Sequence, residues 1–327
     1  MGIKLKRLED QVLVITGGTS GIGLATATRA AERGARVVLC SWNEPELRET
    51  VSTIEERGGI ARSVVADVTH QEDLERLAST AIEEFGTIDT WVNNAGVSIY
   101  GALTEVAIED MRRLFEVNFW GTVYGARAAI ARLRGSGGAV INIGNVVSDR
   151  AIPLQGAYSA SKHAVKGFTD ALRMELEEEG APISVTLIKP SAIDTPYFQH
   201  AKNYMAVEPK PPAPAYGPEV VANAVLRAAE HPIRDITIGT ALPRLTDFYM
   251  ERATFDARRL GTPAAMRVGN LYAGAPEGGK ERGEYRGRVM HSSAHPRAGL
   301  SPRKALLAAG LGLAVFAGIR SLASSAD

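Results

Sequence analysis

The chain has 327 residues, which is enough for one large domain with an extension or for two domains. Its 37 Lys and Arg residues balance 37 Asp and Glu residues, so the sequence lacks the basic excess of a nucleic-acid-binding protein. The single cysteine, Cys40, excludes an intramolecular disulfide, and the six histidines show no ligand spacing, so no metal site is expected.

Short apolar runs alternate with helical patterns along most of the chain. Because these runs are continuously apolar, they predict strands that are buried on both faces. With helices between them, they predict an α/β fold of the Rossmann type, a doubly wound parallel sheet of about seven strands with helices on both faces. The predicted strands are 11–16, 35–40, 61–67, 88–94, 138–144, 183–190 and 233–239, and the predicted helices are 21–34, 44–59, 71–86, 105–134, 157–179 and 218–230.

The pattern loosens toward the C-terminus. Residues 208–219 are too rich in proline for a helix and predict an extended arm or lid, and residues 262–303 have the glycine, arginine and serine content of a linker. We therefore divide the chain into three parts. They are a Rossmann-fold catalytic domain at 1–245, a variable extension with a flexible linker at 246–303, and an apolar helix at 304–322.

The apolar C-terminal segment is a candidate membrane anchor. Fifteen uncharged residues at 305–319 would span roughly 22 Å as a helix, against about 30 Å for a hydrocarbon core. If Arg320 snorkelled, the apolar stretch would extend to Leu322. The alternatives are an amphipathic or partner-docking helix and a disordered tail. The charged N-terminus is not a secretory signal, so we expect a cytoplasmic protein, either free or attached to a membrane through this segment.

The first predicted strand runs directly into the glycine-rich turn TGGTSGIGLA, which contains Gly17, Gly21 and Gly23. Glycine suits a backbone that must turn tightly and approach a pyrophosphate closely, and the following helix N-terminus offers N–H groups and a partial positive charge. The turn therefore predicts a nucleotide site. Its spacing is G-x-x-x-G-x-G rather than the usual dinucleotide fingerprint G-x-G-x-x-G.

Further markers stand at the ends of successive predicted strands, where ligands bind in open α/β sheets. Asp67 ends the third strand and Asn94-Ala95-Gly96 ends the fourth, followed by Asn118 and the pair Tyr158-x-x-x-Lys162. In this order, the set resembles the short-chain dehydrogenase/reductase family over residues 8–240, which implies an NAD(P)-dependent oxidoreductase.

The resemblance implies roles for single residues. Asp67 would bind the adenine edge, Asn94 would support the cofactor cleft, and Thr195 would contact the nicotinamide carboxamide or a nearby phosphate. The family usually has glycine after the position of Pro190, and here it is Ser191. The expected cofactor-binding residues are Gly17, Thr19, Ser20, Gly21, Ile22, Gly23, Trp42, Asp67, Val68, Asn94, Ala95, Gly96, Tyr158, Lys162, Pro190, Ile193 and Thr195.

The choice between NAD and NADP depends on the end of the second strand. An acidic residue there would hold a ribose 2′-OH, and an arginine would accept a 2′-phosphate. The sequence has Ser41-Trp42-Asn43 instead, and family members that prefer NADP often carry arginine at the position of Trp42. The lack of an acidic residue favours NADP slightly, although Trp42 could equally stack against adenine.

Tyr158 and Lys162 lie four residues apart and therefore on one face of a helix. A nearby ammonium would lower the pKa of the phenol, which is otherwise near 10, toward the working range. Tyr158 could then give a proton to a carbonyl oxygen or remove it from an alcohol. The resemblance implies that Lys162 holds the nicotinamide ribose and that Asn118 anchors a water in the proton relay.

Asn145 stands thirteen residues before Tyr158, where most of the family has a serine that donates to the substrate oxygen. An amide can also donate, and Ser148 could compensate only if the loop bulged. We expect an active but slowed or respecialised reductase with Asn145 as substitute polariser. The alternative is a catalytically weakened nucleotide-binding regulatory or scaffold protein.

The substrate and the assembly are less well specified by the sequence. The segment VSIYGAL at 97–103 and the apolar tail slightly favour an apolar carbonyl or alcohol. By analogy with the family, helices 105–134 and 157–179 would pair copies of the chain in a homodimer or homotetramer.

Overall fold

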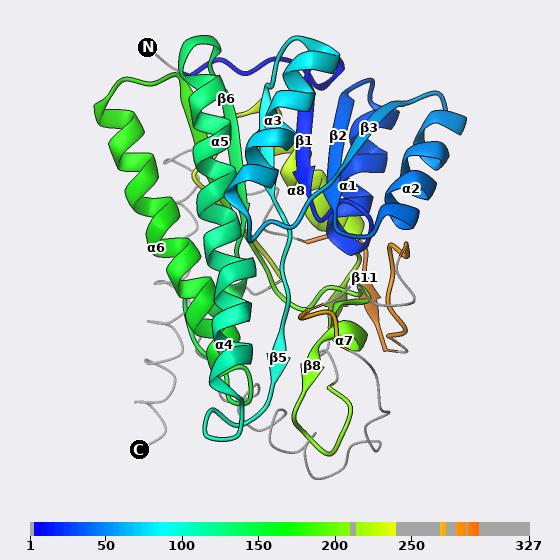
Figure 1. The fold of residues 1–327 in the computed structure, drawn as a ribbon, viewed down its shortest axis with the longest axis vertical. Coiled ribbons are helices and arrows are strands. Elements are labelled where there is room, and N and C mark those ends of the chain that lie inside the picture. Colours follow the sequence, from blue (N-terminus) through cyan, green and yellow to red (C-terminus); the bar gives the residue numbers. More distant parts are fainter. Residues whose placement is uncertain (1–2, 210–213, 240–268, 273–278, 286, 294–327) are drawn as a thin grey trace, which may run out of the picture.

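One seven-stranded parallel sheet runs through the centre of the molecule (Figure 1). The computed structural model describes residues 3–209, 214–239, 269–272, 279–285 and 287–293. The strand order is β10-β7-β6-β4-β1-β2-β3, and every neighbouring pair is parallel. The strands are β1 (Val12–Thr16), β2 (Arg36–Ser41), β3 (Ile60–Val65), β4 (Thr90–Asn93), β6 (Gly138–Ile143), β7 (Ile183–Pro190) and β10 (Asp235–Ile238).

Helices cover both faces of the sheet and enclose two apolar cores. Figure 1 shows α3, α5 and α6 on the near face and α1 and α8 on the far face. The helices are α1 (Gly21–Glu32), α2 (Glu44–Glu56), α3 (Gln71–Phe85), α4 (Ile108–Phe115), α5 (Gly121–Ser136), α6 (Gly156–Glu178), α7 (Tyr197–His200) and α8 (Pro218–Glu230). Three short turns are η1 (Leu8–Asp10), η2 (Glu116–Trp120) and η3 (Val146–Ser148).

The predicted sheet is confirmed. All seven predicted strands belong to it, and their ends agree within two residues. The reason is visible in β1, whose five residues are all buried, as a parallel strand covered on both faces requires. The predicted helix 105–134 is a nearly continuous run of α4, η2 and α5 in which η2 is a single π-helical turn.

The described parts of the C-terminal region pack against the catalytic domain. In the predicted arm 208–219, β9 (Ala215–Tyr216) pairs in parallel with β11 (Val289–Met290). A second small sheet joins β5 (Ile99–Tyr100) to β8 (Lys202–Asn203). The division of the chain at 245 and 303 stays a prediction, because most of 246–303 is not described.

The candidate membrane anchor at 304–322 lies outside the described residues. Among the helices that the structure does describe, none combines the length and the apolar character needed to cross a membrane.

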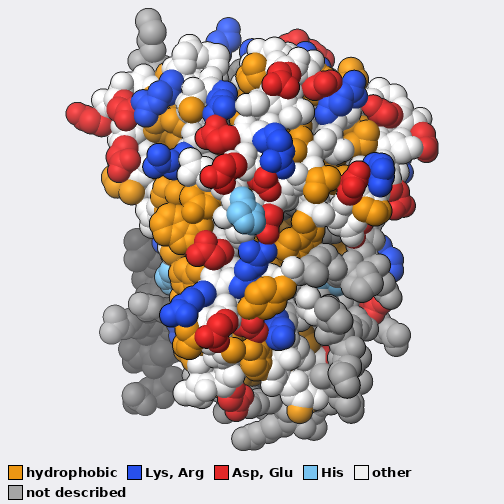
Figure 2. All heavy atoms as spheres, viewed as in Figure 1, with side chains coloured by type: hydrophobic (Ala, Val, Ile, Leu, Met, Phe, Trp, Pro, Cys, Tyr) orange, Lys and Arg blue, Asp and Glu red, His pale blue; other side chains and the backbone are white. Residues whose placement is uncertain are grey.

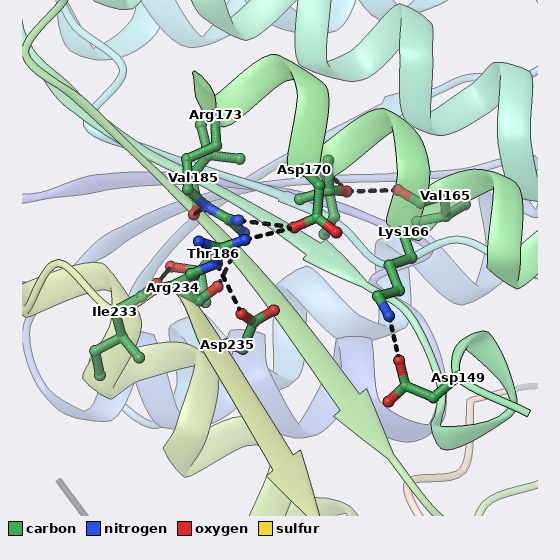
Figure 3. A network of polar contacts seen from close by, with 12 residues as sticks. Asp149, Val165, Lys166, Asp170, Arg173, Val185, Thr186, Ile233, Arg234 and Asp235 are labelled. Atoms are coloured by element: carbon green, nitrogen blue, oxygen red, sulfur yellow. Dashed lines mark hydrogen bonds and ion pairs between the residues drawn. The ribbon is translucent and has the colours of Figure 1, made fainter. Parts of the chain in front are cut away.

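A network of charged side chains ties α6 to the neighbouring strands (Figure 3). Arg173 donates to the carbonyl oxygen of Val185 in β7 at 2.9 Å and to Asp170 at 2.9 Å, and Arg234, just before β10, also reaches Asp170 at 3.5 Å. Four residues before Asp170 on the same helix, Lys166 pairs with Asp149 at 2.5 Å. These contacts matter for function because α6 carries Tyr158 and Lys162.

Candidate active site

The turn between β1 and α1 requires glycine. Gly17 and Gly21 have φ angles of 65° and 51°, in the left-handed region that strains other residues. A Cβ on Gly23 would lie 2.0 Å from the carbonyl oxygen of Gly17. Asn94, at the end of β4, donates to the carbonyl oxygens of Thr16 at 2.9 Å and of Gly17 at 3.0 Å. The turn before α1 thus carries no bulky side chain and is fixed in shape, which allows a phosphate group to approach the backbone closely.

Residues 93–96 connect this turn to the predicted proton relay. The main-chain N–H of Ala95 donates to the Thr16 hydroxyl at 3.1 Å. A Cβ on Gly96 would lie 3.3 Å from Asn118 Oδ1 and 3.8 Å from Lys162 Nζ. The glycine-rich turn, Asn118 and Lys162 therefore meet around the loop that follows β4.

The loop after β7 brings Thr195 against the glycine-rich turn. A Cβ on Gly21 would lie 3.1 Å from the Thr195 side chain, and the Thr195 N–H donates to the carbonyl oxygen of Ile193 at 2.9 Å. Pro190 ends β7. The next residue, Ser191, has a buried hydroxyl with no hydrogen-bond partner among the described residues.

A C-terminal segment, residues 279–285, crosses the same turn. The N–H of Gly21 donates to the carbonyl oxygen of Lys280 at 3.0 Å, and a Cβ on Gly283 would lie 2.5 Å from the carbonyl oxygen of Thr195. Arg282 pairs with Glu219, in the first turn of α8, at 3.2 Å. This contact could not be predicted from the sequence, because the segment carries no motif and its composition is that of a linker.

The end of the site where adenine is expected contains an unpredicted cation. Arg113, on α4, pairs with Asp67 at 2.9 Å and lies 6.0 Å from the centre of the Trp42 ring. Burial alone would raise the pKa of Asp67, but hydrogen bonds from Arg113 and Thr69 outweigh it and lower the pKa. Val68, the next residue, is buried against Gly121. Asp67 is therefore held as a carboxylate by Arg113, which also contacts Trp42.

Asn118 lies in the π turn η2 and is fully buried. Its side-chain oxygen accepts from the N–H of Val97 at 2.8 Å, and its amide nitrogen donates to the carbonyl oxygen of Val97 at 3.0 Å and to Ser161 Oγ at 3.1 Å. Single π turns inside α-helices often occur at functional sites. The side-chain amide of Asn118 thus joins the loop after β4 to α6. Because that amide is occupied, the water predicted for the proton relay would have to bind to another atom of Asn118.

Lys162 is buried and donates from Nζ to the carbonyl oxygen of Ile143, at the end of β6, at 2.8 Å. Burial lowers its pKa to about 8, because an apolar environment disfavours the ammonium form. Its Nζ lies 5.9 Å from the centre of the Tyr158 ring. A group with a pKa near 8 can give or take a proton close to neutral pH.

Tyr158 faces the same region and has only 5% of its surface exposed. Burial raises its pKa to about 12, and side-chain interactions with Tyr197 and Asn145 lower it only in part. The sequence predicted a pKa brought toward neutral by Lys162. The structure differs because desolvation of the phenolate is the dominant effect and Lys162 is engaged by Ile143.

Asn145 caps the short turn η3. Its side-chain oxygen accepts from the N–H of Val147 at 3.0 Å, which leaves the amide nitrogen to interact with Tyr158. Ser148 is buried, and its hydroxyl accepts from the N–H of Asn145 at 3.2 Å. The carbonyl of Asn145 is therefore turned away from the phenol, and Ser148 supports the loop.

Aromatic side chains form the wall beside Tyr158. The ring of Tyr197 lies 5.8 Å from that of Tyr158, and Phe198 packs between Tyr197 and Tyr100 at 5.7 and 6.4 Å. The Tyr197 hydroxyl is buried near Tyr158 and lowers the pKa of that phenol, but it has no well-aligned hydrogen-bond partner in the described part of the chain. Sequence reasoning missed this wall, because α7 is only four residues long and has no motif.

A family model described as short chain dehydrogenase matches residues 11–205, which is more than half of the chain. The chain belongs to the short-chain dehydrogenase family. The uncharacterized oxidoreductase YxnA of Bacillus subtilis is 45% identical over 313 residues, which are 92% of this chain and 88% of that protein.

Two solved structures show the same fold. A short-chain dehydrogenase/reductase of Burkholderia phymatum in complex with NAD is 26% identical with a TM-score of 0.67, and the match covers 80% of this chain and 99% of that one. An alcohol dehydrogenase of Thermococcus sibiricus complexed with 5-hydroxy-NADP is 25% identical with a TM-score of 0.63, covering 70% and 95%. As a member of this family, the chain is an oxidoreductase.

Lys162 gives this short-chain dehydrogenase a pH-dependent stability. Because burial lowers the Lys162 pKa from 10.5 to about 8, the unfolded chain binds more protons between these values. Burial of the Lys162 ammonium therefore lowers the free energy of unfolding by its full amount below pH 8. As pH rises from 8 to 10.5, this destabilisation disappears and the free energy of unfolding increases. Lys162→Met is expected to be more stable than wild type at pH 7 by up to about 3 kcal/mol, with the difference shrinking toward pH 10.

Urea unfolding of both proteins at pH 7 and pH 10 measures this difference. Lys166→Met is the control, since Lys166 is paired with Asp149, its pKa is raised, and its removal should give no gain in stability. A Lys162→Met variant whose advantage over wild type is the same at both pH values would contradict the assigned pKa.

Proposed function

We propose that this chain reversibly transfers hydride between a nicotinamide cofactor and a carbonyl or secondary alcohol, with Tyr158 as the acid and base. The observation that carries the proposal is the meeting of Tyr158, Lys162 and Asn145 around a buried, aromatic-walled site beside the glycine-rich turn. None of these features is unusual by itself. Their combination provides a proton donor, an amide polariser and a nucleotide cradle in one place.

The described residues fit a dinucleotide. The side-chain-free turn at Gly17, Gly21 and Gly23 suits the pyrophosphate, provided that segment 279–285 releases the Gly21 N–H, which it holds through the carbonyl oxygen of Lys280. Asp67 and Trp42, which both contact Arg113, suit the adenine, and Thr195 suits the nicotinamide end. When bound, the nicotinamide supplies or accepts the hydride. The residues directly after β2 do not distinguish NAD from NADP, because they include neither an acidic residue nor an arginine.

Side chains of the protein supply and replace the proton that the carbonyl oxygen receives. With a pKa of about 12, Tyr158 is a neutral phenol at physiological pH and can donate to the carbonyl oxygen as hydride reaches the carbonyl carbon. The Asn145 amide nitrogen can donate to the same oxygen. Lys162 can return a proton toward the phenolate that results. In the reverse direction Tyr158 must first lose its proton, so alcohol oxidation is expected to be favoured by high pH.

An apolar substrate is supported by the aromatic wall of Tyr100, Tyr197 and Phe198. The test is oxidation of NADH and NADPH by the full-length protein with a panel of aliphatic and aromatic ketones. Steady turnover with at least one ketone is expected. Cofactor binding without turnover on any ketone would favour the alternative, a nucleotide-binding regulatory or scaffold protein.

A homodimer or homotetramer remains a proposal, and an exposed aromatic patch supports it. Figure 2 shows hydrophobic side chains gathered over the α5 and α6 side of the molecule. Trp120 is 41% exposed and stacks on Tyr124 at 5.9 Å, and Met174 on α6 is 59% exposed. Large exposed apolar side chains of this kind are typical of surfaces that pair.

Membrane attachment through residues 304–322 also stays a prediction. If this segment enters a bilayer, full-length protein is expected to remain with membranes after carbonate extraction, whereas a protein ending at residue 300 is released. Release of both proteins would contradict attachment. Retention of both would locate the membrane contact elsewhere in the chain.

A further inference from the structure

A carboxylate stands near the end of β2 although the sequence has no acidic residue directly after that strand. Glu46 lies in the first turn of α2, and the Asn43 amide nitrogen donates to Glu46 Oε1 at 2.6 Å. In return, the N–H of Glu46 donates to Asn43 Oδ1 at 3.3 Å. This reciprocal pair is a helix cap, and it draws the Glu46 side chain back toward the loop that follows β2.

The same loop meets the glycine-rich turn. The Thr19 hydroxyl donates to Ser41 Oγ at 3.4 Å, and the N–H of Asn43 donates to Ser41 Oγ at 3.3 Å. The Glu46 carboxyl group also interacts with Thr19, which lowers its pKa, although burial raises the pKa more strongly. The glycine-rich turn, the end of β2 and the start of α2 therefore converge on one carboxyl group.

The place where they converge is where the adenosine ribose must lie if the cofactor binds as proposed above. In a doubly wound fold the group that reads the ribose 2′ position stands at the end of β2, next to the glycine-rich turn. The side chains that occupy that position here, Ser41 and Asn43, are neutral. The Glu46 side chain is partly buried and accepts a hydrogen bond from the side-chain amide of Asn43.

The two cofactors differ at this position by a phosphate. A ribose 2′-OH can donate a hydrogen bond to a carboxylate, whereas a 2′-phosphate brings a charge of about −1.5 to −2 close to it. Like charges a few ångströms apart repel, and burial strengthens the repulsion. One cation near this part of the site, Arg113, is already paired with Asp67 at 2.9 Å.

We propose that the Glu46 carboxylate disfavours the 2′-phosphate of NADP and makes this enzyme prefer NAD, an inference that rests on the proposed function. It reverses the slight preference for NADP expected from the sequence after β2. Sequence alone does not distinguish Glu46 from the neighbouring acidic residues of α2, because the contact with Asn43 that directs it toward the ribose position is visible only in the structure.

Calorimetric titration of the full-length protein with NAD⁺ and with NADP⁺ tests this. Wild type is expected to bind NAD⁺ on the order of tenfold more tightly. Glu46→Gln keeps an acceptor for Asn43 but loses the charge, and it should reduce that ratio about tenfold, mainly through tighter NADP⁺ binding. Glu46→Lys should bind NADP⁺ more tightly than NAD⁺. The matched control is Glu49→Gln, which removes an exposed charge from the same helix and should leave the ratio unchanged.

The outcomes separate the two proposals. If wild type binds NAD⁺ or NADP⁺ but prefers NADP⁺, or if Glu46→Gln leaves the ratio of the two dissociation constants unchanged, the role of Glu46 is overturned and the proposed function stands. If neither cofactor binds to the folded wild-type protein, the proposed function fails and this inference fails with it. An equal change in Glu49→Gln would also overturn it, since the effect would then be one of general charge.

Discussion

Replacing Tyr158 with phenylalanine is expected to lower kcat for carbonyl reduction by about 10²–10⁴-fold, the usual contribution of a general acid. The ring of Tyr158 is buried, so phenylalanine keeps the packing and removes only the hydroxyl. Because burial raises the phenol pKa to about 12, wild type carries the transferable proton at neutral pH, and the variant has none to give. Initial rates of NADH and NADPH oxidation with an accepted ketone measure the loss.

The control for this experiment is Tyr197→Phe. The Tyr197 ring lies 5.8 Å from that of Tyr158, and its hydroxyl is also buried, but it makes no acceptable hydrogen bond to the described residues. A much smaller loss of rate is expected, with cofactor dissociation constants near those of wild type in both variants. Equal losses in the two variants, or a Tyr158→Phe protein with nearly full activity, would contradict the assignment of Tyr158 as the acid.

Asn145→Ala is expected to lower kcat by about 10²–10³-fold, the effect of removing one well-aimed donor to a developing oxyanion. In the structure the side-chain oxygen of Asn145 is occupied by the N–H of Val147, so the amide nitrogen is the part that can face a substrate oxygen. The measurement is kcat with saturating cofactor and ketone, where loss of a transition-state contact appears directly.

Two further substitutions at this position separate the donor from the cap. Asn145→Asp keeps an acceptor for Val147 but loses the donor, so it should fold like wild type and be at least as inactive as Asn145→Ala. Asn145→Ser restores the residue usual in the family and is expected to be faster on at least one accepted ketone. A serine variant that is no faster on any of them would contradict the view that Asn145 limits the chemistry.

The sheet and the order of the site residues could be predicted because each depends on local sequence. The continuous apolar run of β1 predicts a buried parallel strand, and Pro218 at the first position of α8 marks the start of that helix where the structure has it. Gly17, Gly21 and Gly23 indicate the tight turn for the same local reason, since no other residue fits the backbone.

The remaining features depend on contacts between distant parts of the chain. Arg113 pairs with Asp67 from 46 residues away, and the carbonyl oxygen of Lys280 reaches Gly21 from a segment with no motif. The pKa of Tyr158 is raised by burial and lowered in part by Tyr197 and Asn145, effects that the spacing of Tyr158 and Lys162 cannot reveal. Spacing along one helix indicates which groups meet, and the surrounding packing decides their protonation.

Deuteride transfer tests the central claim most directly. Full-length enzyme is incubated with a ketone panel and with NADH or NADPH deuterated at C4 of the nicotinamide on either face, and the alcohols are examined by mass spectrometry. We predict that one ketone at least yields an alcohol carrying a single deuterium at the carbinol carbon, from one face of the cofactor only, and that Tyr158→Phe yields far less. Cofactor that binds to the folded wild-type protein but never passes deuterium to any ketone would contradict the proposed reaction.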